Sequence, residues 1–186
     1  MGLVMPTNDH RITIEGLNFR RYISHRRIQK RLTDLAHWVD HSYAADEPLV
    51  LLAVLSGSFR IAADLVTKLR RPVFIEFIRA KSYDGLNSSG EVSWQLPAQL
   101  DLAGKHVLVI EDIIDSGLTM HELILKLNSI HCLSIKVATL LLKKDCLKHA
   151  VPEDWVGFYI PDLFVIGYGL DLNGRARELN DIYQLA

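Results

Sequence analysis

The stretch that most constrains the fold of this chain is residues 107–119, VLVIEDIIDSGLT. Residues 107–110 form a short, continuous apolar run rich in β-branched side chains, which is typical of a strand buried on both faces of a parallel sheet. A small polar turn follows at residues 115–119, and residues 120–130 then have helical spacing, with Leu123, Leu127 and Ile130 on one face. The order of strand, turn and helix predicts one unit of an α/β fold.

The polar groups of this stretch suit a ligand. Glu111 and Asp112 directly follow the apolar run, and open α/β sheets bind ligands at the carboxyl ends of their strands. Adjacent carboxylates repel each other and need a cation or a hydroxyl as partner. A turn that opens a helix presents free backbone N–H groups to a phosphate; Gly117 allows close approach, and Ser116 and Thr119 add hydroxyl donors. The pattern therefore predicts a sugar-phosphate site, although a solvated acidic turn before a capped helix has the same pattern.

The rest of the chain repeats this alternation. A helix is expected after Ser24, which is a candidate N-cap, with Ile28, Leu32, Leu35 and Val39 as its apolar stripe, and a second helix is expected at residues 59–69. Apolar or alternating runs predict strands at residues 12–14, 49–55, 73–79, 91–94, 134–142, 155–160 and 164–168. The alternation from residue 49 to residue 142 predicts a parallel α/β sheet.

Composition narrows the function. A chain of 186 residues that is 49% hydrophobic can bury a core as one domain, and a net charge of −1 argues against a general nucleic-acid binder. The two cysteines form neither a zinc motif nor a disulfide framework, which favours a reducing compartment. No apolar run is long enough for a membrane span, and the N-terminus has no signal-peptide pattern. We therefore expect a soluble cytoplasmic protein that binds neither nucleic acid nor membrane.

The stretch VLVIEDIIDSGLT resembles the 5-phosphoribosyl-1-pyrophosphate (PRPP) signature of type I phosphoribosyltransferases, and specifically that of their hypoxanthine-guanine branch. The resemblance extends over residues 23–183. It implies a single domain, residues 1–186, with a parallel-sheet, Rossmann-like core. It also implies a small hood subdomain made mainly of residues 1–20 and 150–186, and a flexible catalytic loop at residues 81–91 that carries Ser82 and Tyr83.

The resemblance implies purine salvage. The 5-phosphoribosyl group of PRPP would pass to hypoxanthine, and to guanine, giving IMP or GMP and pyrophosphate, with Mg²⁺ as cofactor and a homodimer or homotetramer as the assembly. Three alternatives stay open. A relative that accepts xanthine would share these motifs, whereas an adenine or orotate enzyme would lack Lys143 and the hood pattern. A PRPP-responsive regulator on the same fold would bind RNA or DNA through a basic face or an added domain.

The resemblance also assigns roles to residues. PRPP would be held by Glu111, Asp112, Asp115, Ser116, Gly117, Leu118 and Thr119. Asp115 would be the general base, and the metal ligands would be Glu111, Asp112 and Asp171. The purine would be held by Lys143 at O6, by stacking on Phe164, by the backbone of Val165 and by Asp171.

Pyrophosphate would be bound by Leu55, Ser56, Gly57 and Arg177. The peptide that corresponds to Leu55–Ser56 is often cis in this family. The chain departs from its relatives at Ser56, where they usually carry Lys or Arg. Another cation, Arg60 or Arg177, is expected to compensate.

Overall fold

Two β-sheets of unequal size organise the chain. The computed structural model describes residues 11–82 and 92–186. The larger sheet has the strand order β5-β4-β3-β6-β7-β8. Its strands are β3 (Leu49–Leu55), β4 (Phe74–Ser82), β5 (Val92–Gln95), β6 (His106–Ile114), β7 (Ser134–Leu142) and β8 (Trp155–Tyr159). Neighbouring strands run parallel except β4 and β5, so the carboxyl ends of β3, β6, β7 and β8 meet at one edge of the sheet.

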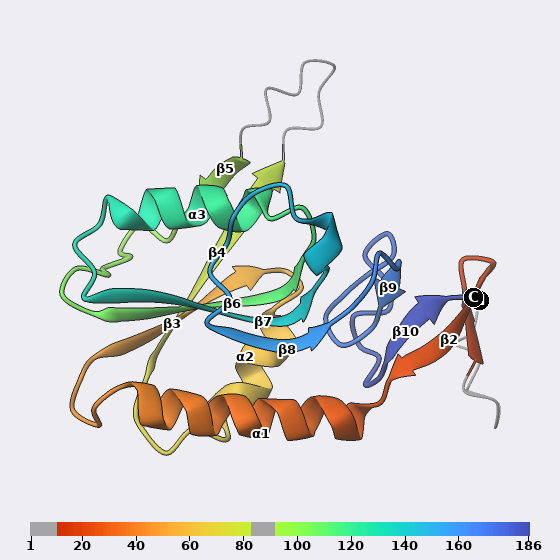
Figure 1. Cartoon of the computed structure of the whole chain (residues 1–186), viewed down its shortest axis with the longest axis horizontal. Helices are drawn as coiled ribbons and strands as arrows, with labels where there is room; N and C mark the ends of the chain where they lie inside the picture. The colour runs from red at the N-terminus through yellow and green to blue at the C-terminus, as the bar shows by residue number, and fades with distance from the viewer. Residues whose placement is uncertain (1–10, 83–91) are drawn as a thin grey trace.

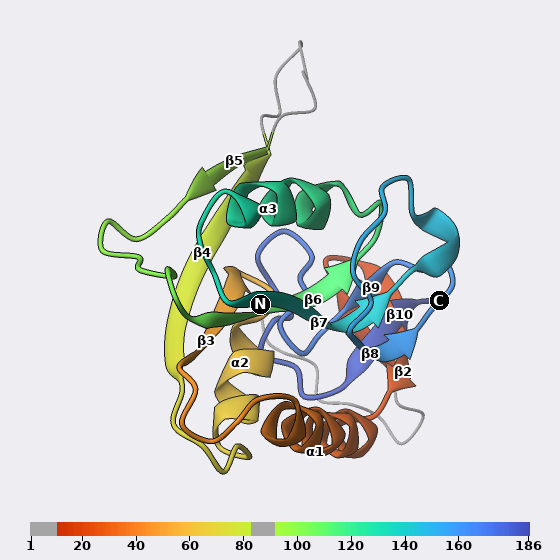
Figure 2. The ribbon, with the colours of Figure 1, turned by 60° about the vertical axis from the view of Figure 1, so that its left-hand side comes forward.

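Helices cover both faces of the larger sheet (Figures 1 and 2), with α1 (His25–Ser42) and α2 (Phe59–Val66) on one face and α3 (Leu118–Asn128) on the other. Alternate strand residues enter the two cores: Leu51 and Leu108 pack with the α1 and α2 side, whereas Leu52 and Val109 pack with the α3 side. Burial on both faces explains why these strands are continuous apolar runs.

The smaller sheet joins the two ends of the described chain. Its order is β1-β2-β10-β9, with β1 (Arg11–Ile14), β2 (Leu17–Ile23), β9 (Val165–Ile166) and β10 (Ile182–Leu185). It encloses a small core of its own around Phe19, Ile166 and Tyr183. In Figure 1 it lies beyond the carboxyl ends of β7 and β8, so it faces the edge where ligands are expected.

The predicted fold class is confirmed: a parallel-sheet α/β core carries a small hood built from N-terminal and C-terminal residues. The bounds given for the hood remain a prediction. Among the late strands, β8 pairs with β7 in the larger sheet, whereas β9 pairs with β10 in the smaller one.

Several predicted element bounds need correction. The strand expected to stop at Ile110 continues to Ile114, because pairing with β7 persists through Glu111 and Ile113. The two carboxylates are therefore part of β6. The second helix ends at Val66, three residues early. The third begins at Leu118 and ends at Asn128.

The start of α1 also differs from expectation. Ser24 is the N-cap residue, but its side chain makes no capping hydrogen bond. The carboxylate of Asp181, from the hood, instead accepts a hydrogen bond from the His25 N–H at 2.6 Å. Sequence patterns predict capping residues only within a few positions of the helix start. They cannot predict a partner that lies 156 positions away along the chain.

Candidate functional site

Paired carboxylates of β6 lie at the edge of the sheet that faces the hood. Glu111 is buried, with 7% of its surface exposed, and its Oε1 accepts a hydrogen bond from the Asp112 N–H at 3.2 Å. Burial first, and the charge of Asp112 second, raise the pKa of Glu111 well above its usual range. A buried carboxylate with an acidic neighbour favours a cation or hydroxyl partner.

The turn that follows the neighbouring strand β3 places Gly57 against this pair. A Cβ added to Gly57 would lie 1.5 Å from Oδ2 of Asp112, so the carboxylate occupies space that only glycine leaves open. The residues that follow β3 and those that end β6 are therefore in contact. This contact brings the predicted pyrophosphate turn and the predicted metal ligands together.

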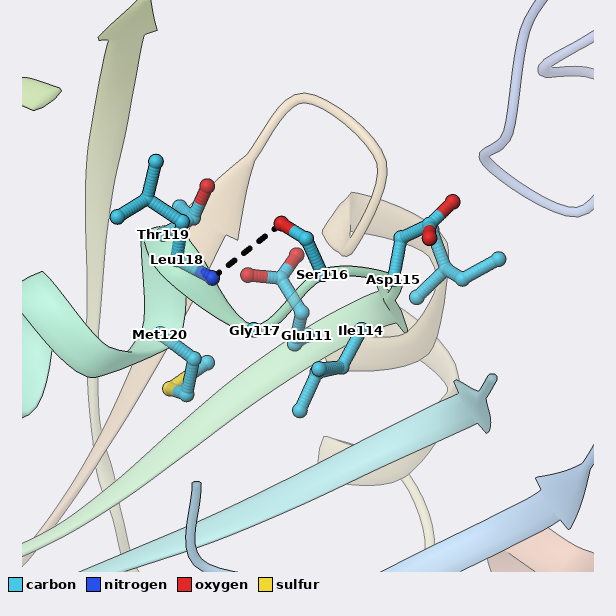
Figure 3. A pocket seen from close by; sticks show the side chains of 9 residues that line it. Glu111, Ile114, Asp115, Ser116, Gly117, Leu118, Thr119 and Met120 are labelled. Carbon is cyan, nitrogen blue, oxygen red and sulfur yellow. Dashed lines mark hydrogen bonds between the residues drawn. The ribbon is translucent and has the colours of Figure 1, made fainter. Parts of the chain in front are cut away.

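The β6–α3 turn, residues 115–117, opens α3 as expected. Gly117 has a φ of +82° and is the N-cap residue. A Cβ there would lie 2.7 Å from the His149 carbonyl oxygen. Ser116 Oγ accepts a 3.4 Å hydrogen bond from the Leu118 N–H, drawn in Figure 3. The first N–H groups of a helix have no intrahelical partner, so this turn presents donors and a positive dipole to an anion.

A pocket of about 120 Å³ is formed at this turn. It is lined by Glu111, Ile113, Ile114 and residues 115–120 (Figure 3). The predicted phosphate-binding residues therefore surround one small hollow that also receives the Glu111 carboxylate. In Figure 3 the Asp115 side chain points away from Glu111.

Asp115 points to the predicted purine-binding lysine. Lys143 Nζ donates to Asp115 Oδ2 at 2.7 Å and to Asp162 Oδ1 at 2.9 Å. The Lys143 side chain is 9% exposed, whereas those of Asp115 and Asp162 are 56% and 75% exposed. Burial alone would lower the pKa of Lys143, but the hydrogen bonds that its ammonium donates to Asp115 and Asp162 raise it. Lys143 is therefore held as an ammonium between the Asp115 and Asp162 carboxylates.

The predicted metal ligands do not converge. Among the described residues, one group of three side chains places possible ligand atoms within 4.8 Å of one another: Asp115, Cys146 and Asp162. This group does not include the predicted ligands Glu111, Asp112 and Asp171. The Lys143 ammonium already bonds the carboxylates of Asp115 and Asp162. Asp171 instead pairs with Arg177 at 2.7 Å and accepts the Gly174 N–H at 2.7 Å. Glu111 and Asp112 form one acidic pair, with Asp171 in a separate hood contact.

The β3–α2 turn, residues 56–58, is the predicted pyrophosphate site. The Leu55–Ser56 peptide is cis. Buried Ser58 donates its hydroxyl to the Val54 carbonyl at 2.6 Å. Gly169 of the hood packs closely against this turn, because a Cβ added to Gly169 would lie 2.0 Å from the Gly57 carbonyl oxygen. The hood therefore contacts the predicted pyrophosphate turn directly.

Both cations expected to compensate for Ser56 have hood partners. Arg60 donates to the Glu178 carbonyl at 2.8 Å and lies over the Tyr168 ring at 4.9 Å. Arg177 bonds Asp171 and donates to the Gly169 carbonyl at 2.6 Å. Another guanidinium, that of Arg79, contacts the turn: its Nη2 lies 3.4 Å from Ser56 Oγ.

The remaining predicted residues lie in the hood or at a gap. Phe164 is 47% exposed and is tilted against Phe19, with ring centroids 6.3 Å apart. Val165 begins β9 and is buried. Ser82 ends β4, and Tyr83, with most of the predicted catalytic loop, lies outside the described residues.

Two residues close to the site were missed by sequence reasoning. Arg79 is paired in register with Leu55 across β3 and β4. The pairing of two strands of a parallel sheet was foreseeable, but its register was not. Asp162, in a Pro-Asp turn, has the appearance of an ordinary turn residue. Only its contact with Lys143 distinguishes it.

Comparison with known proteins agrees with this geometry. The phosphoribosyl transferase domain family matches residues 20–173. The hypoxanthine-guanine phosphoribosyltransferase of Aquifex aeolicus (strain VF5) is 36% identical over 177 residues, covering 92% of this chain and 97% of that protein. The corresponding Dictyostelium discoideum protein is 40% identical over 158 residues, covering 83% and 88%.

Solved structures show the same likeness. A hypoxanthine-guanine phosphoribosyltransferase from Bacillus anthracis superposes with a TM-score of 0.83 at 36% identity, covering 89% of this chain and 98% of that one. A hypoxanthine phosphoribosyltransferase from Staphylococcus aureus gives a TM-score of 0.84 at 32% identity, covering 90% and 91%. Fold, signature turn and relatives agree: this chain belongs to the phosphoribosyltransferase family, in its hypoxanthine-guanine branch.

Proposed function

We propose that this enzyme transfers the 5-phosphoribosyl group of PRPP to hypoxanthine, and to guanine, releasing pyrophosphate. The observation that carries the proposal is the position of Lys143. Its ammonium donates a hydrogen bond to Asp115, and Asp115 belongs to the turn that lines the pocket proposed for phosphate. The β6–α3 turn therefore contributes the proton acceptor and the phosphate site, and the residue that follows the neighbouring strand β7 contributes the donor for O6.

The reaction follows from the roles of these groups. A purine ring nitrogen attacks C1 of the ribose, the bond from C1 to pyrophosphate breaks, and the imidazole proton passes to Asp115. The β6–α3 turn holds the 5-phosphate through backbone N–H groups and the Ser116 and Thr119 hydroxyls. The acidic pair Glu111 and Asp112 holds the ribose hydroxyls, directly or through the metal. Phe164 and Val165 hold the base at the hood.

Mg²⁺ fits the acidic pair. Its preferred ligands are carboxylate oxygens and water, and the raised pKa of Glu111, caused by burial and then by Asp112, favours a positive partner. When bound, the ion would neutralise the charge that develops on the leaving pyrophosphate. Glu111 and Asp112 would hold it. Asp171 would join them only after leaving Arg177.

For pyrophosphate we propose Arg79 as the cation that offsets Ser56. Its guanidinium contacts Ser56 in the β3–α2 turn directly, and no hood residue takes part in that contact. Arg60 holds α2 against the hood through the Glu178 carbonyl, whereas Arg177 donates within the hood, to the Gly169 carbonyl. Arg177 would additionally face the ligand from the hood side.

Assembly and location are also proposals. We propose a homodimer or homotetramer in the cytoplasm, with PRPP and a 6-oxopurine as small-molecule partners and no nucleic-acid or membrane partner. Among the described residues, none of the helices is both long and apolar enough to cross a membrane. Both cysteines are free thiols, which suits a reducing compartment.

The test is nucleotide formation from PRPP with each of hypoxanthine, guanine, xanthine and adenine. Formation of IMP and GMP supports the proposal, and xanthine turnover would extend the substrate range. Adenine as the preferred base would overturn the assignment. Binding of PRPP without turnover of any base would favour the regulatory alternative.

A further inference from the structure

The surroundings of Lys143 suggest a role for a residue outside the proposed catalytic set. An ammonium has three N–H groups. In the described part of the chain, two of them point to carboxylates: Asp115 after β6, and Asp162 between β8 and β9. Both partners are anchored far from Lys143 in sequence, by 28 and 19 residues. This arrangement fixes the direction of the third N–H, which is available to a substrate acceptor.

The two carboxylates cannot serve Lys143 equally during turnover. This step rests on the proposed function, in which Asp115 accepts the imidazole proton. Once protonated, Asp115 is neutral and becomes a weaker acceptor for the Lys143 ammonium, because hydrogen bonds to charged partners are the stronger ones. Asp162 has no part in the proton transfer. It therefore keeps its charge while that of Asp115 changes.

We propose that Asp162 is a positioning residue for base recognition, holding Lys143 directed at O6 of the purine while Asp115 changes its protonation state. Base specificity then depends on a residue that does not itself touch the base. A purely structural role would be different. Asp162 would then only tie the segment before β9 to the end of β7, and its loss would affect all substrates alike.

The experiment compares Asp162→Asn with Asp145→Asn. Asp145 is an exposed carboxylate two residues from Lys143, so its replacement makes the same change in charge. We expect Asp162→Asn to raise KM for hypoxanthine about tenfold, the lower end of the range for losing one charge-assisted hydrogen bond, because Asp115 still accepts from Lys143. KM for PRPP should stay within about twofold of wild type, and the preference for hypoxanthine over adenine should fall about tenfold. Asp145→Asn should behave as wild type, and Asp162→Glu should recover part of the preference.

A double-mutant cycle separates positioning from structure. In a Lys143→Gln background, Asp162→Asn should have no further effect on the hypoxanthine-to-adenine preference. An equal effect with and without Lys143 would overturn the inference, as would a matching rise in KM for PRPP. If the wild-type enzyme made no nucleotide from hypoxanthine, the proposed function itself would fail. If it did so while Asp162→Asn matched Asp145→Asn, only the role of Asp162 would fail.

Discussion

The β6–α3 turn and the β3–α2 turn have the same local design and different surroundings. Each follows a buried parallel strand, contains Ser and Gly, and opens a helix. The β6–α3 turn borders an open pocket. The β3–α2 turn is pressed by Gly169 and tied to the hood through Arg60. Local sequence therefore specifies the strand–turn–helix unit, whereas tertiary contacts decide what surrounds each turn.

Removing the proton acceptor of the β6–α3 turn should have the largest effect. Asp115→Asn keeps the size of the side chain but cannot accept a proton at neutral pH. We expect kcat to fall about 10²–10⁴-fold, the usual range for a positioned general base. Steady-state kinetics check this, and PRPP affinity should change much less. A kcat within a few-fold of wild type with a raised KM for PRPP would make Asp115 a binding residue.

The two glycines provide a matched test of the two turns. Gly117→Ala places a side chain at positive φ, which costs about 1–2 kcal/mol, and meets the His149 carbonyl. Gly57→Ala lacks the positive φ, and the atoms nearest to its new methyl group belong to the Asp112 side chain, which can shift at less cost than backbone. We therefore expect thermal denaturation to show a clear loss for Gly117→Ala and a smaller one for Gly57→Ala.

The affinity for PRPP, measured with and without Mg²⁺, tests the contact of Gly57 with Asp112. Gly57→Ala displaces a proposed Mg²⁺ ligand, so it should weaken PRPP binding in the presence of Mg²⁺ and have little effect without it. Calorimetric titration with and without Mg²⁺ measures this. Equal weakening of PRPP binding in both conditions would mean that Gly57 is needed for the shape of the turn and not for the position of Asp112.

Arg79 tests how the β3–α2 turn compensates for Ser56. Arg79→Gln removes the guanidinium that lies 3.4 Å from Ser56 Oγ. A lost charge-assisted contact is worth about 1.5–3 kcal/mol, so KM for PRPP should rise roughly 10- to 100-fold. The double variant Ser56→Lys, Arg79→Gln should recover part of the loss. An unchanged KM in Arg79→Gln would return the role to Arg60 or Arg177.

The smallest effect expected is on stability, at Glu111. Its pKa is raised well above 4.5 by burial and by Asp112, so the folded protein holds this proton more tightly than the unfolded chain. The protonated group contributes stability that is complete below about 4.5 and is lost as pH rises through the raised pKa. Unfolding free energy should therefore fall with pH more steeply in wild type than in Glu111→Gln.

Mg²⁺ with PRPP should remove this difference. The ion would stabilise the ionised carboxylate, so wild type should regain stability at alkaline pH while Glu111→Gln gains less. Denaturant titrations across the pH range, with and without these ligands, test both statements. Parallel pH dependence in the two proteins would mean that Glu111 is not the titrating group.

Sequence reasoning succeeded where the signal was local. The buried strands 49–55 and 134–142 were predicted at the bounds observed, because an apolar run and its polar flanks are both visible in the sequence. The turn that opens α3 was predicted from Gly117 and its polar neighbours, and its role in phosphate binding stays a prediction. The expected apolar stripe of α1 is buried at Ile28, Leu32, Leu35 and Val39.

It failed where partners are distant along the chain. Neither the Asp181 cap of α1 nor the contact of Arg79 with Ser56 has a pattern in the sequence, since each depends on strand register and hood placement. The bound of β6 was wrong for the same reason: charged residues suggested an end, but pairing with β7 continued. Charged residues after an apolar run therefore indicate a ligand site without showing where the strand ends.

Lys143 is expected to select a 6-oxopurine, and the ratio of kcat/KM for hypoxanthine to kcat/KM for adenine measures this selection. Lys143 can only donate, and adenine presents an amino donor where hypoxanthine presents O6. A site built for one polar group rejects an analogue lacking it by about 10⁴–10⁵-fold. We expect a wild-type ratio in this range that narrows in Lys143→Gln, because an amide can donate or accept. Comparable wild-type values for the two bases would contradict the account, and an unchanged ratio in Lys143→Gln would place base recognition at another residue.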